Sequence, residues 1–251
     1  MTYYLGSEGR NRLYGDLAKY WPLMSPPEEY ADESPHWRNQ ILTHFNKRPV
    51  RALELGTGGG HFLSHLTDIV DATAVDLSES MLENARRLNP EVEHIVGDMR
   101  SIRLERTFDV VLIHDAIAYI TSEDDLAATF ASARAHLEPG GLFMTMPDHY
   151  IDRPVWPYIN HRTHTQGDRE LTYIEYSSPD VNNPSLLQSS FLFVITENGE
   201  RRMELDHHTT GLFPVDTWRR LIEEAGFSVE RLNYPVADGP ISQYLWVATA
   251  I

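Results

Sequence analysis

The sequence predicts an α/β protein built on a mainly parallel β-sheet, and three features support this prediction. Residues 50–55 read as a buried strand that enters a glycine-rich turn, and apolar residues at helical spacing follow the turn. Residues 72–76 and 93–98 read as two further strands, each of which ends in an acidic residue. Residues 108–114 form an almost continuous apolar run, which is typical of a strand buried on both faces of a parallel sheet.

The glycine-rich turn contains Gly56, Gly58 and Gly60, and it predicts a ligand site. Glycines allow a tight turn and let a ligand approach main-chain N–H groups, and the N-terminus of a following helix favours the same place. A dinucleotide-binding fingerprint requires its third glycine at position 61, which is His61 here. On its own, this stretch leaves open the alternative of an ordinary glycine-rich turn in an α/β protein.

The acids near the ends of the first three strands indicate which kind of ligand the turn binds. Glu54, Asp76 and Asp98 follow one another at intervals of 22 residues. The ends of parallel strands meet at one edge of a sheet, where a carboxylate after the second strand can accept both ribose hydroxyls of an adenosine. Three such signals in order are more specific than the turn alone, and they predict an adenosine-containing ligand.

The pattern acid-x-Gly-x-Gly-x-Gly from Glu54 to Gly60 resembles motif I of the class I S-adenosylmethionine-dependent methyltransferases. The resemblance is close over residues 48–150 and implies a Rossmann-like, seven-stranded sheet with S-adenosyl-L-methionine as cofactor. It also implies that Asp98 binds the adenine amino group and that Met99 packs near the ring. The expected cofactor-binding residues are Tyr20, Glu54, Gly56, Thr57, Gly58, Asp76, Leu77, Met81, Asp98, Met99 and His114.

Composition favours a small-molecule acceptor over nucleic acid or a membrane. The net charge of −16 repels phosphate backbones and anionic lipids. No apolar run approaches the roughly 18 residues of a membrane span, and the first residues lack the pattern of a signal peptide. The absence of cysteine excludes disulfides and cysteine-ligated metals, and it agrees with a cytoplasmic protein. We expect a monomer or a homodimer.

We expect the chain to be organised into a lid, a core and an insert. The predicted regions are an N-terminal helical lid at 1–46, a cofactor-binding core at 47–150 and 212–251, and an inserted antiparallel cover at 151–211. Within the lid, helices are expected at residues 10–20 and 28–45, interrupted by prolines. Three strands are expected in the insert, at 171–176, 187–196 and 203–210. This layout resembles the small-molecule N-methyltransferases, including the amino-sugar dimethyltransferases.

Acceptor-site residues are expected after the fourth and fifth strands and on the insert. The catalytic candidates are His149 and Tyr119, and the substrate-binding candidates are Tyr14, Asp148 and His207. His207 and His208 alternate in an extended strand, so at most one of them points into the cleft. In the amino-sugar enzymes a histidine lies where this chain has Tyr119, which is a departure from the family pattern. The sequence has no compact three-ligand motif, so no metal is expected.

The expected reaction is methyl transfer to a small molecule, with an amine as the preferred acceptor. Alignment of the attacking atom with the methyl group can supply much of the acceleration. An amine must be neutral at its nitrogen, whereas a hydroxyl acceptor gains more from a general base. Two alternatives stay open, an O-methyltransferase of a small hydroxylated metabolite and a non-catalytic module that binds S-adenosylmethionine.

Overall fold

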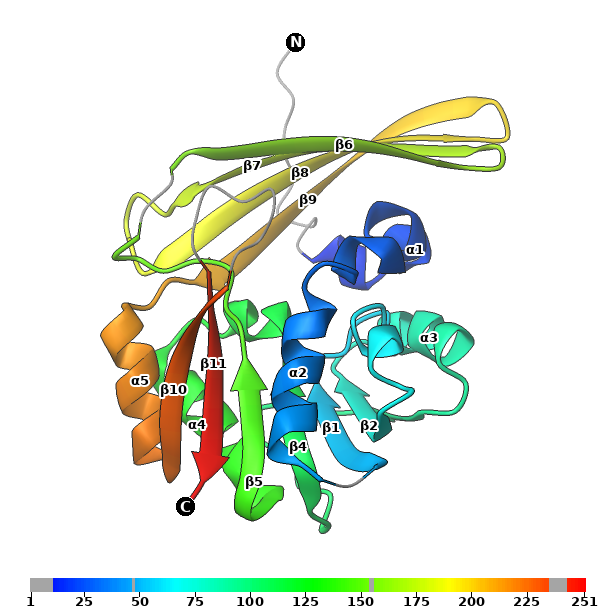
Figure 1. Ribbon diagram of the computed structural model, residues 1–251. Coiled ribbons are helices and arrows are strands. Elements are labelled where there is room, and N and C mark those ends of the chain that lie inside the picture. The colour runs from blue at the N-terminus through cyan, green and yellow to red at the C-terminus, as the bar shows by residue number, and fades with distance from the viewer. Residues whose placement is uncertain (1–10, 47, 154–155, 235–242) are drawn as a thin grey trace.

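The structure is a computed structural model that describes residues 11–46, 48–153, 156–234 and 243–251 (Figure 1). It contains a seven-stranded sheet and a separate four-stranded sheet, which lies above the upper edge of the larger one in Figure 1. Residues 1–10 of the expected lid lie outside the described residues.

The larger sheet has the predicted architecture. Its strands are β1 (Val50–Leu55), β2 (Val70–Asp76), β3 (Glu93–Val96), β4 (Phe108–Ile113), β5 (Leu137–Thr145), β10 (Phe227–Tyr234) and β11 (Gln243–Ala250). Their order is β10-β11-β5-β4-β1-β2-β3, and β11 runs antiparallel to both of its neighbours. Leu53, Val75, Val96 and Val111 lie on the four neighbouring strands β1, β2, β3 and β4, which confirms the predicted sheet.

Helices pack on both faces of this sheet because its strands are apolar on both sides. The helices on its two faces are α2 (Ser34–His44), α3 (Glu79–Leu88), α4 (Glu123–Ala135) and α5 (Val215–Glu224). Phe130 of α4 and Trp218 of α5 belong to one core cluster, whereas Trp37 and Ile41 of α2 belong to the cluster on the other face. Ser78 accepts a hydrogen bond from the Met81 amide, so it caps α3 as its position in the sequence predicts.

The smaller sheet is antiparallel and has one strand more than expected. Its strands are β6 (Tyr158–Gln166), β7 (Arg169–Pro179), β8 (Leu186–Glu197) and β9 (Glu200–Gly211), paired in that order. Asn198 and Gly199 have φ angles of 55° and 78°, which form the tight hairpin predicted between β8 and β9. The alternation of apolar residues did not predict β6, because this edge strand pairs on one side only and is mostly polar.

The N-terminal region differs from the two helices expected. It consists of η1 (Arg12–Tyr14), η2 (Ala18–Tyr20), α1 (Trp21–Met24) and η3 (Pro27–Tyr30), followed by α2. Prolines at positions 22, 26 and 27 keep these turns short. Leu13 and Leu17 pack with Phe191 and Phe193 of β8, so this region fills the space beneath the smaller sheet, where Figure 1 shows α1.

The expected helix after the glycine-rich turn is also absent among the described residues. A single 3₁₀ turn, η4 (Leu63–His65), takes its place. The ligand site at the turn therefore depends on backbone geometry and strand-end side chains rather than on a helix dipole.

Candidate active site

A cavity of about 580 Å³ lies at the carboxyl ends of β1, β2, β3 and β4. The N-terminal region and β9 also contribute to its walls. The lining residues are Asn11, Tyr14, Trp21, Tyr30, Glu54, Gly56, Thr57, Gly58, His61, Phe62, Asp76, Leu77, Ser78, Gly97, Asp98, Met99, Arg100, His114, Asp115, Ala116, Tyr119, Ile120, Thr121, Asp125 and Thr209. Nine of the eleven predicted cofactor residues are in this set, and Tyr20 and Met81 are not.

The glycine-rich turn is held by the acid at the end of β2. The Gly58 amide donates to Asp76 Oδ2 at 2.7 Å, and the Ser78 amide donates to Asp76 Oδ1 at 2.8 Å. Gly56 has a φ of +77°, and a Cβ added there would lie 2.4 Å from the Cβ of Ala116. Only glycine fits this position, so the turn can present its main chain to a ligand.

Glu54 lies beneath the turn and is 2% exposed. Burial raises the pKa of its carboxyl to about 7, although a hydrogen bond from the Thr57 hydroxyl works in the opposite direction. The free protein therefore holds Glu54 close to the midpoint of its titration at neutral pH.

His114 follows β4 and is also buried. Its ring stacks on Phe62 at 4.3 Å, and its two nitrogens lie 3.4 Å from carboxylate oxygens of Glu33 and Asp115. Burial alone would lower the pKa of His114, but these two carboxylates raise it well above its ordinary value. His114 is therefore a paired cation rather than a free base.

Asp98 lies at the cavity wall after β3, where the adenine-binding acid was predicted. Its carboxylate accepts from Arg100 at 2.5 Å, and Arg100 also reaches Asp125 at 3.2 Å. The Cε atom of Met99 lies 3.0 Å from the position of a Cβ at Gly56, so Met99 packs against the turn.

Tyr20 lies outside the cavity, although it was expected to close over the cofactor. Its hydroxyl donates to Glu197 at 2.9 Å beneath the smaller sheet, so its side chain points away from the glycine turn. The adjacent Trp21 lines the cavity instead. A Cβ added at Gly59 would lie 2.4 Å from the Trp21 ring, which shows how closely the indole covers the turn.

Met81 is the other predicted cofactor residue outside the cavity lining. Met81 lies on α3 and is fully buried. Its Cε atom lies 3.4 Å from the position that a Cβ would take at Gly58. Met81 thus supports the turn from within the protein.

A chain of hydrogen bonds joins the cavity wall to the buried side of β9. The hydroxyls of Tyr14 and Tyr119 lie 2.8 Å apart, and the Tyr119 hydroxyl lies 2.5 Å from His208 Nδ1. His208 Nε2 lies 2.8 Å from Asp206 Oδ2. Burial raises the pKa of Tyr14 and of Tyr119 well above the ordinary value, so both phenols stay neutral.

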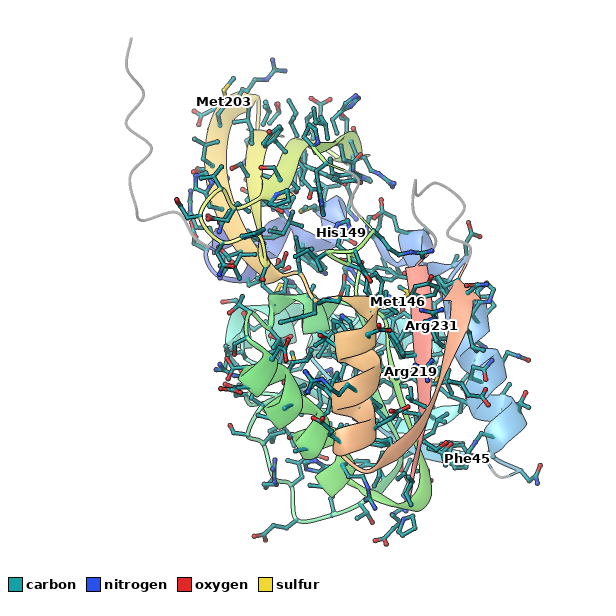
Figure 2. All side chains as sticks on the ribbon, turned by 90° about the vertical axis from the view of Figure 1, so that its left-hand side faces the viewer. Phe45, Met146, His149, Met203, Arg219 and Arg231 are labelled. Atoms are coloured by element: carbon teal, nitrogen blue, oxygen red, sulfur yellow. The ribbon has the colours of Figure 1, made fainter. Side chains whose placement is uncertain are left out.

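Three of the predicted acceptor-site residues do not line the cavity. His149 is half-buried against Trp156, with 5.0 Å between ring centroids, and Figure 2 shows it where the two sheets meet. Burial lowers the pKa of His149 to about 4. His207 contacts Ser190 at 3.1 Å on the face of β9 opposite His208. Asp148 does not line the cavity. Burial raises the pKa of its carboxyl, and the negative charge of the nearby Asp115 raises it further.

Sequence reasoning did not name Trp21 or Asp206, and it left His208 as the alternative to His207. The pair Asp206 and His208 has a local signal, since residues two apart in a strand share a face. An acid and a histidine at that spacing can form a buried hydrogen-bonded pair, and the structure shows that they do. Trp21 has no comparable signal, because its position depends on where the 3₁₀ turns end.

The part of the chain that the structure describes contains neither a metal-binding cluster nor a membrane-spanning helix. Within residues 11–46, 48–153, 156–234 and 243–251, no group of three or more His, Asp or Glu side chains is arranged to hold a metal ion. In the same part of the chain, no helix has the length and apolar character that a membrane crossing requires.

Comparisons with known proteins agree with this geometry. Residues 52–141 match a family described as a methyltransferase domain. The chain is 28% identical over 197 residues to dTDP-3-amino-3,4,6-trideoxy-alpha-D-glucopyranose N,N-dimethyltransferase of Streptomyces venezuelae, covering 78% of this chain and 81% of that protein. It is 26% identical over 220 residues to dTDP-3-amino-3,6-dideoxy-alpha-D-glucopyranose N,N-dimethyltransferase of Streptomyces fradiae, covering 86% and 85%.

Solved structures share the whole fold. The crystal structure of DesVI from Streptomyces venezuelae superposes with a TM-score of 0.81 at 24% identity, over 94% of this chain and 98% of that one. The structure of S-adenosylmethionine-bound CalS10, an amino pentose methyltransferase from Micromonospora echinaspora, gives a TM-score of 0.77 at 21% identity, over 88% and 92%. At these identities the similarity establishes the fold.

Proposed function

Because this chain is a class I S-adenosylmethionine-dependent methyltransferase, we propose that its methyl acceptor is an amino group on a small molecule. In this proposal the turn at Gly56 and Gly58 holds the methionine part of the cofactor, Asp76 binds the ribose, and Asp98 and Met99 contact the adenine. S-adenosylmethionine supplies a methyl group that its sulfonium makes reactive.

The observation that carries the amine proposal is the charge of the cavity wall. Five carboxyl groups line it, whereas its two cations, Arg100 and His114, are each paired with two carboxylates. The five are Glu54, Asp76, Asp98, Asp115 and Asp125. Such a wall attracts cations and repels anionic acceptors, so it favours an acceptor that arrives as an ammonium ion.

The chemical step balances without a metal or a redox partner. The neutral nitrogen donates its electron pair to the methyl carbon, the bond from that carbon to sulfur breaks, and sulfur keeps the pair. The product nitrogen gains the positive charge that the sulfonium loses. The protein must hold the nitrogen in line with the methyl group and keep it unprotonated.

The relatives support an amino sugar as the acceptor. Three of them bear names of N,N-dimethyltransferases acting on dTDP-linked amino sugars, and two of these align over more than three-quarters of this chain. We therefore place nucleotide-linked amino sugars first among the acceptors to be tested. A small hydroxylated metabolite is the second candidate, since Tyr119 and His208 could also assist a hydroxyl.

The test is a panel of matched acceptors. Amino sugars, free and dTDP-linked, are compared with the same sugars carrying a hydroxyl in place of the amine, and release of S-adenosylhomocysteine is measured. Methylation of the amine alone supports the proposal, and mass spectrometry locates the methyl group. Transfer to the hydroxyl member alone overturns it in favour of the O-methyltransferase.

A further inference from the structure

The buried pair Asp206 and His208 sets the direction of every hydrogen bond in the chain that ends at the cavity. Asp206 Oδ2 lies 2.7 Å from the Leu13 amide and 2.8 Å from His208 Nε2, and Oδ1 accepts from the His207 amide. Burial works to raise the pKa of Asp206, but these donors hold it below the ordinary value. The carboxylate is thus ionised and only accepts, so His208 Nε2 carries a hydrogen.

In the neutral ring the other nitrogen of His208 then has no hydrogen and must accept. The Tyr119 hydroxyl, 2.5 Å from His208 Nδ1, is therefore the donor to it. Since that hydrogen is committed to His208, the Tyr14 hydroxyl must donate to the Tyr119 oxygen across their 2.8 Å contact. The Tyr119 oxygen keeps one lone pair, and Tyr119 lines the cavity.

We propose that His208, acting through the Tyr119 hydroxyl, takes the proton that the acceptor ammonium loses before its nitrogen attacks the methyl group. This inference rests on the proposed amine acceptor. An N–H bond of the ammonium breaks, and its proton joins the Tyr119 oxygen. The Tyr119 O–H bond breaks at the same time, and that proton joins His208 Nδ1. The nitrogen keeps its electron pair, and the imidazolium formed lies against the Asp206 carboxylate.

This proton relay, from the ammonium through Tyr119 to His208, avoids forming an unpaired buried charge. Tyr119 is a neutral phenol before and after the transfer, so no buried phenolate forms. His208 is 2% exposed and gains its charge beside a carboxylate that is fully buried, which stabilises a buried cation. Once the product leaves, the proton returns to water along the same path.

The groups around His208 all suit a proton acceptor. Tyr14 faces it from η1 at 5.4 Å and Tyr119 from η5 (Asp115–Tyr119) at 5.7 Å between ring centroids, and both are neutral. The carboxyl group of Glu175 on β7 also interacts with it, and Phe191 of β8 covers one side at 4.9 Å between ring centroids. The acids Asp206 and Glu175 and the two phenols carry no positive charge that would repel the transferred proton.

The first test determines which ring nitrogen of His208 carries a hydrogen in the free protein, and it needs no substrate. In ¹⁵N-labelled full-length protein, the signals of His208 are assigned among the twelve histidines by comparison with His208→Asn. We expect hydrogen on Nε2 and none on Nδ1 at neutral pH. A hydrogen on Nδ1 in the neutral ring overturns the relay, whatever the acceptor proves to be.

The second test is the pH profile of kcat/KM for the amine acceptor. In His208→Asn the amide oxygen can still accept from Tyr119 but cannot take a proton, and Tyr119→Phe removes the connecting oxygen. Both should lose about 100-fold at pH 7, the scale of general base catalysis. Both should approach the wild type as the pH rises past the pKa of the free amine, because water then supplies the neutral nucleophile. An equal loss at every pH overturns the relay and indicates a structural role.

Glu204→Gln is the matched control. Glu204 also ties β9 to η1, through Arg12 at 2.9 Å, but it takes no part in the chain of hydrogen bonds. Its pH profile should follow the wild type. If no amine in the panel is methylated by the wild type, the proposed function fails, and the tautomer of His208 still decides whether the relay is in place.

Discussion

The Gly58 amide donates a hydrogen bond of 2.7 Å to the Asp76 carboxylate, and this contact joins the glycine turn after β1 to the end of β2. The same carboxylate lines the cavity and is the predicted ribose ligand. One side chain therefore shapes the turn and faces the predicted ligand site, so the two roles cannot be separated by removing it.

We predict that Asp76→Ala weakens binding of S-adenosylhomocysteine by about 1–3 kcal/mol, the scale of lost hydrogen bonds to a charged group. Titration calorimetry measures the change. Asp71→Ala, an exposed acid on the same strand, is the control and should bind as the wild type does. Unchanged affinity in Asp76→Ala would exclude Asp76 as the ribose ligand.

Glu54 makes cofactor binding depend on pH. Its pKa is raised to about 7 by burial, so below pH 7 the free protein mostly holds it protonated and neutral. A cationic cofactor favours the ionised carboxylate, so its affinity should rise with pH through 7 and level off above. We expect binding about tenfold weaker at pH 6 than at pH 8, since one pKa unit corresponds to a factor of ten.

The control ligand for this prediction is adenosine, which is neutral and should bind equally across the range. Glu54→Gln should remove the dependence for S-adenosylmethionine as well. A wild-type affinity for S-adenosylmethionine that does not change between pH 6 and pH 8 contradicts the prediction.

The core of the site could be predicted because strand ends fix positions in space. Glu54, Asp76 and Asp98 each lie within two residues of the end of a parallel strand, and the order β1-β2-β3 places them along one edge of the sheet. No detailed packing is needed for that inference, since the apolar strands specify their own register.

The side chains that the N-terminal region contributes to the cavity wall could not be predicted in the same way. Tyr20 and Trp21 are adjacent, and the resemblance to the methyltransferase family implied that Tyr20 binds the cofactor. The chain instead forms 3₁₀ turns, whose period of three residues moves Trp21 to the cavity and Tyr20 to Glu197. A shift of one residue exchanges the two aromatic rings, and sequence periodicity cannot resolve it.

The same limit explains the choice between His207 and His208. Alternation along β9 requires that only one of them face inward, but polar residues lie on both faces of that strand. In the structure, Asp206 determines which of the two histidines points inward. It shares a face with His208, and its bonds to the main chain of η1 and β9 fix that face inward.

His149→Ala should cost less than about 100-fold in kcat/KM, below the usual contribution of a general base. His149 lies outside the cavity lining, and its pKa of about 4 keeps it neutral at working pH. Steady-state kinetics with the amine acceptor checks the expectation, with Tyr119→Phe as the contrasting variant. A greater loss with an unchanged melting temperature would restore His149 as a catalytic candidate.

Gly59→Ala tests whether the N-terminal region is held against the glycine turn. An added Cβ would lie 2.4 Å from Trp21 Cδ1 and 2.7 Å from its Nε1, and a rigid indole cannot yield as a flexible side chain does. The ring must move away from the turn and the cavity wall that it covers. Overpacking of this kind costs about 1–3 kcal/mol, so we expect S-adenosylhomocysteine to bind about tenfold more weakly.

Two further variants show whether the loss comes from Trp21. Gly15→Ala adds a methyl group to the same N-terminal region, where its nearest neighbour would be the Arg12 oxygen at an ordinary 3.6 Å, and it should bind normally. Trp21→Phe provides room beside the turn, so adding Gly59→Ala to Trp21→Phe should cost much less than adding it to the wild type. If Gly59→Ala weakens binding equally in both backgrounds, the methyl group disturbs the turn itself, and contact with Trp21 is not the cause.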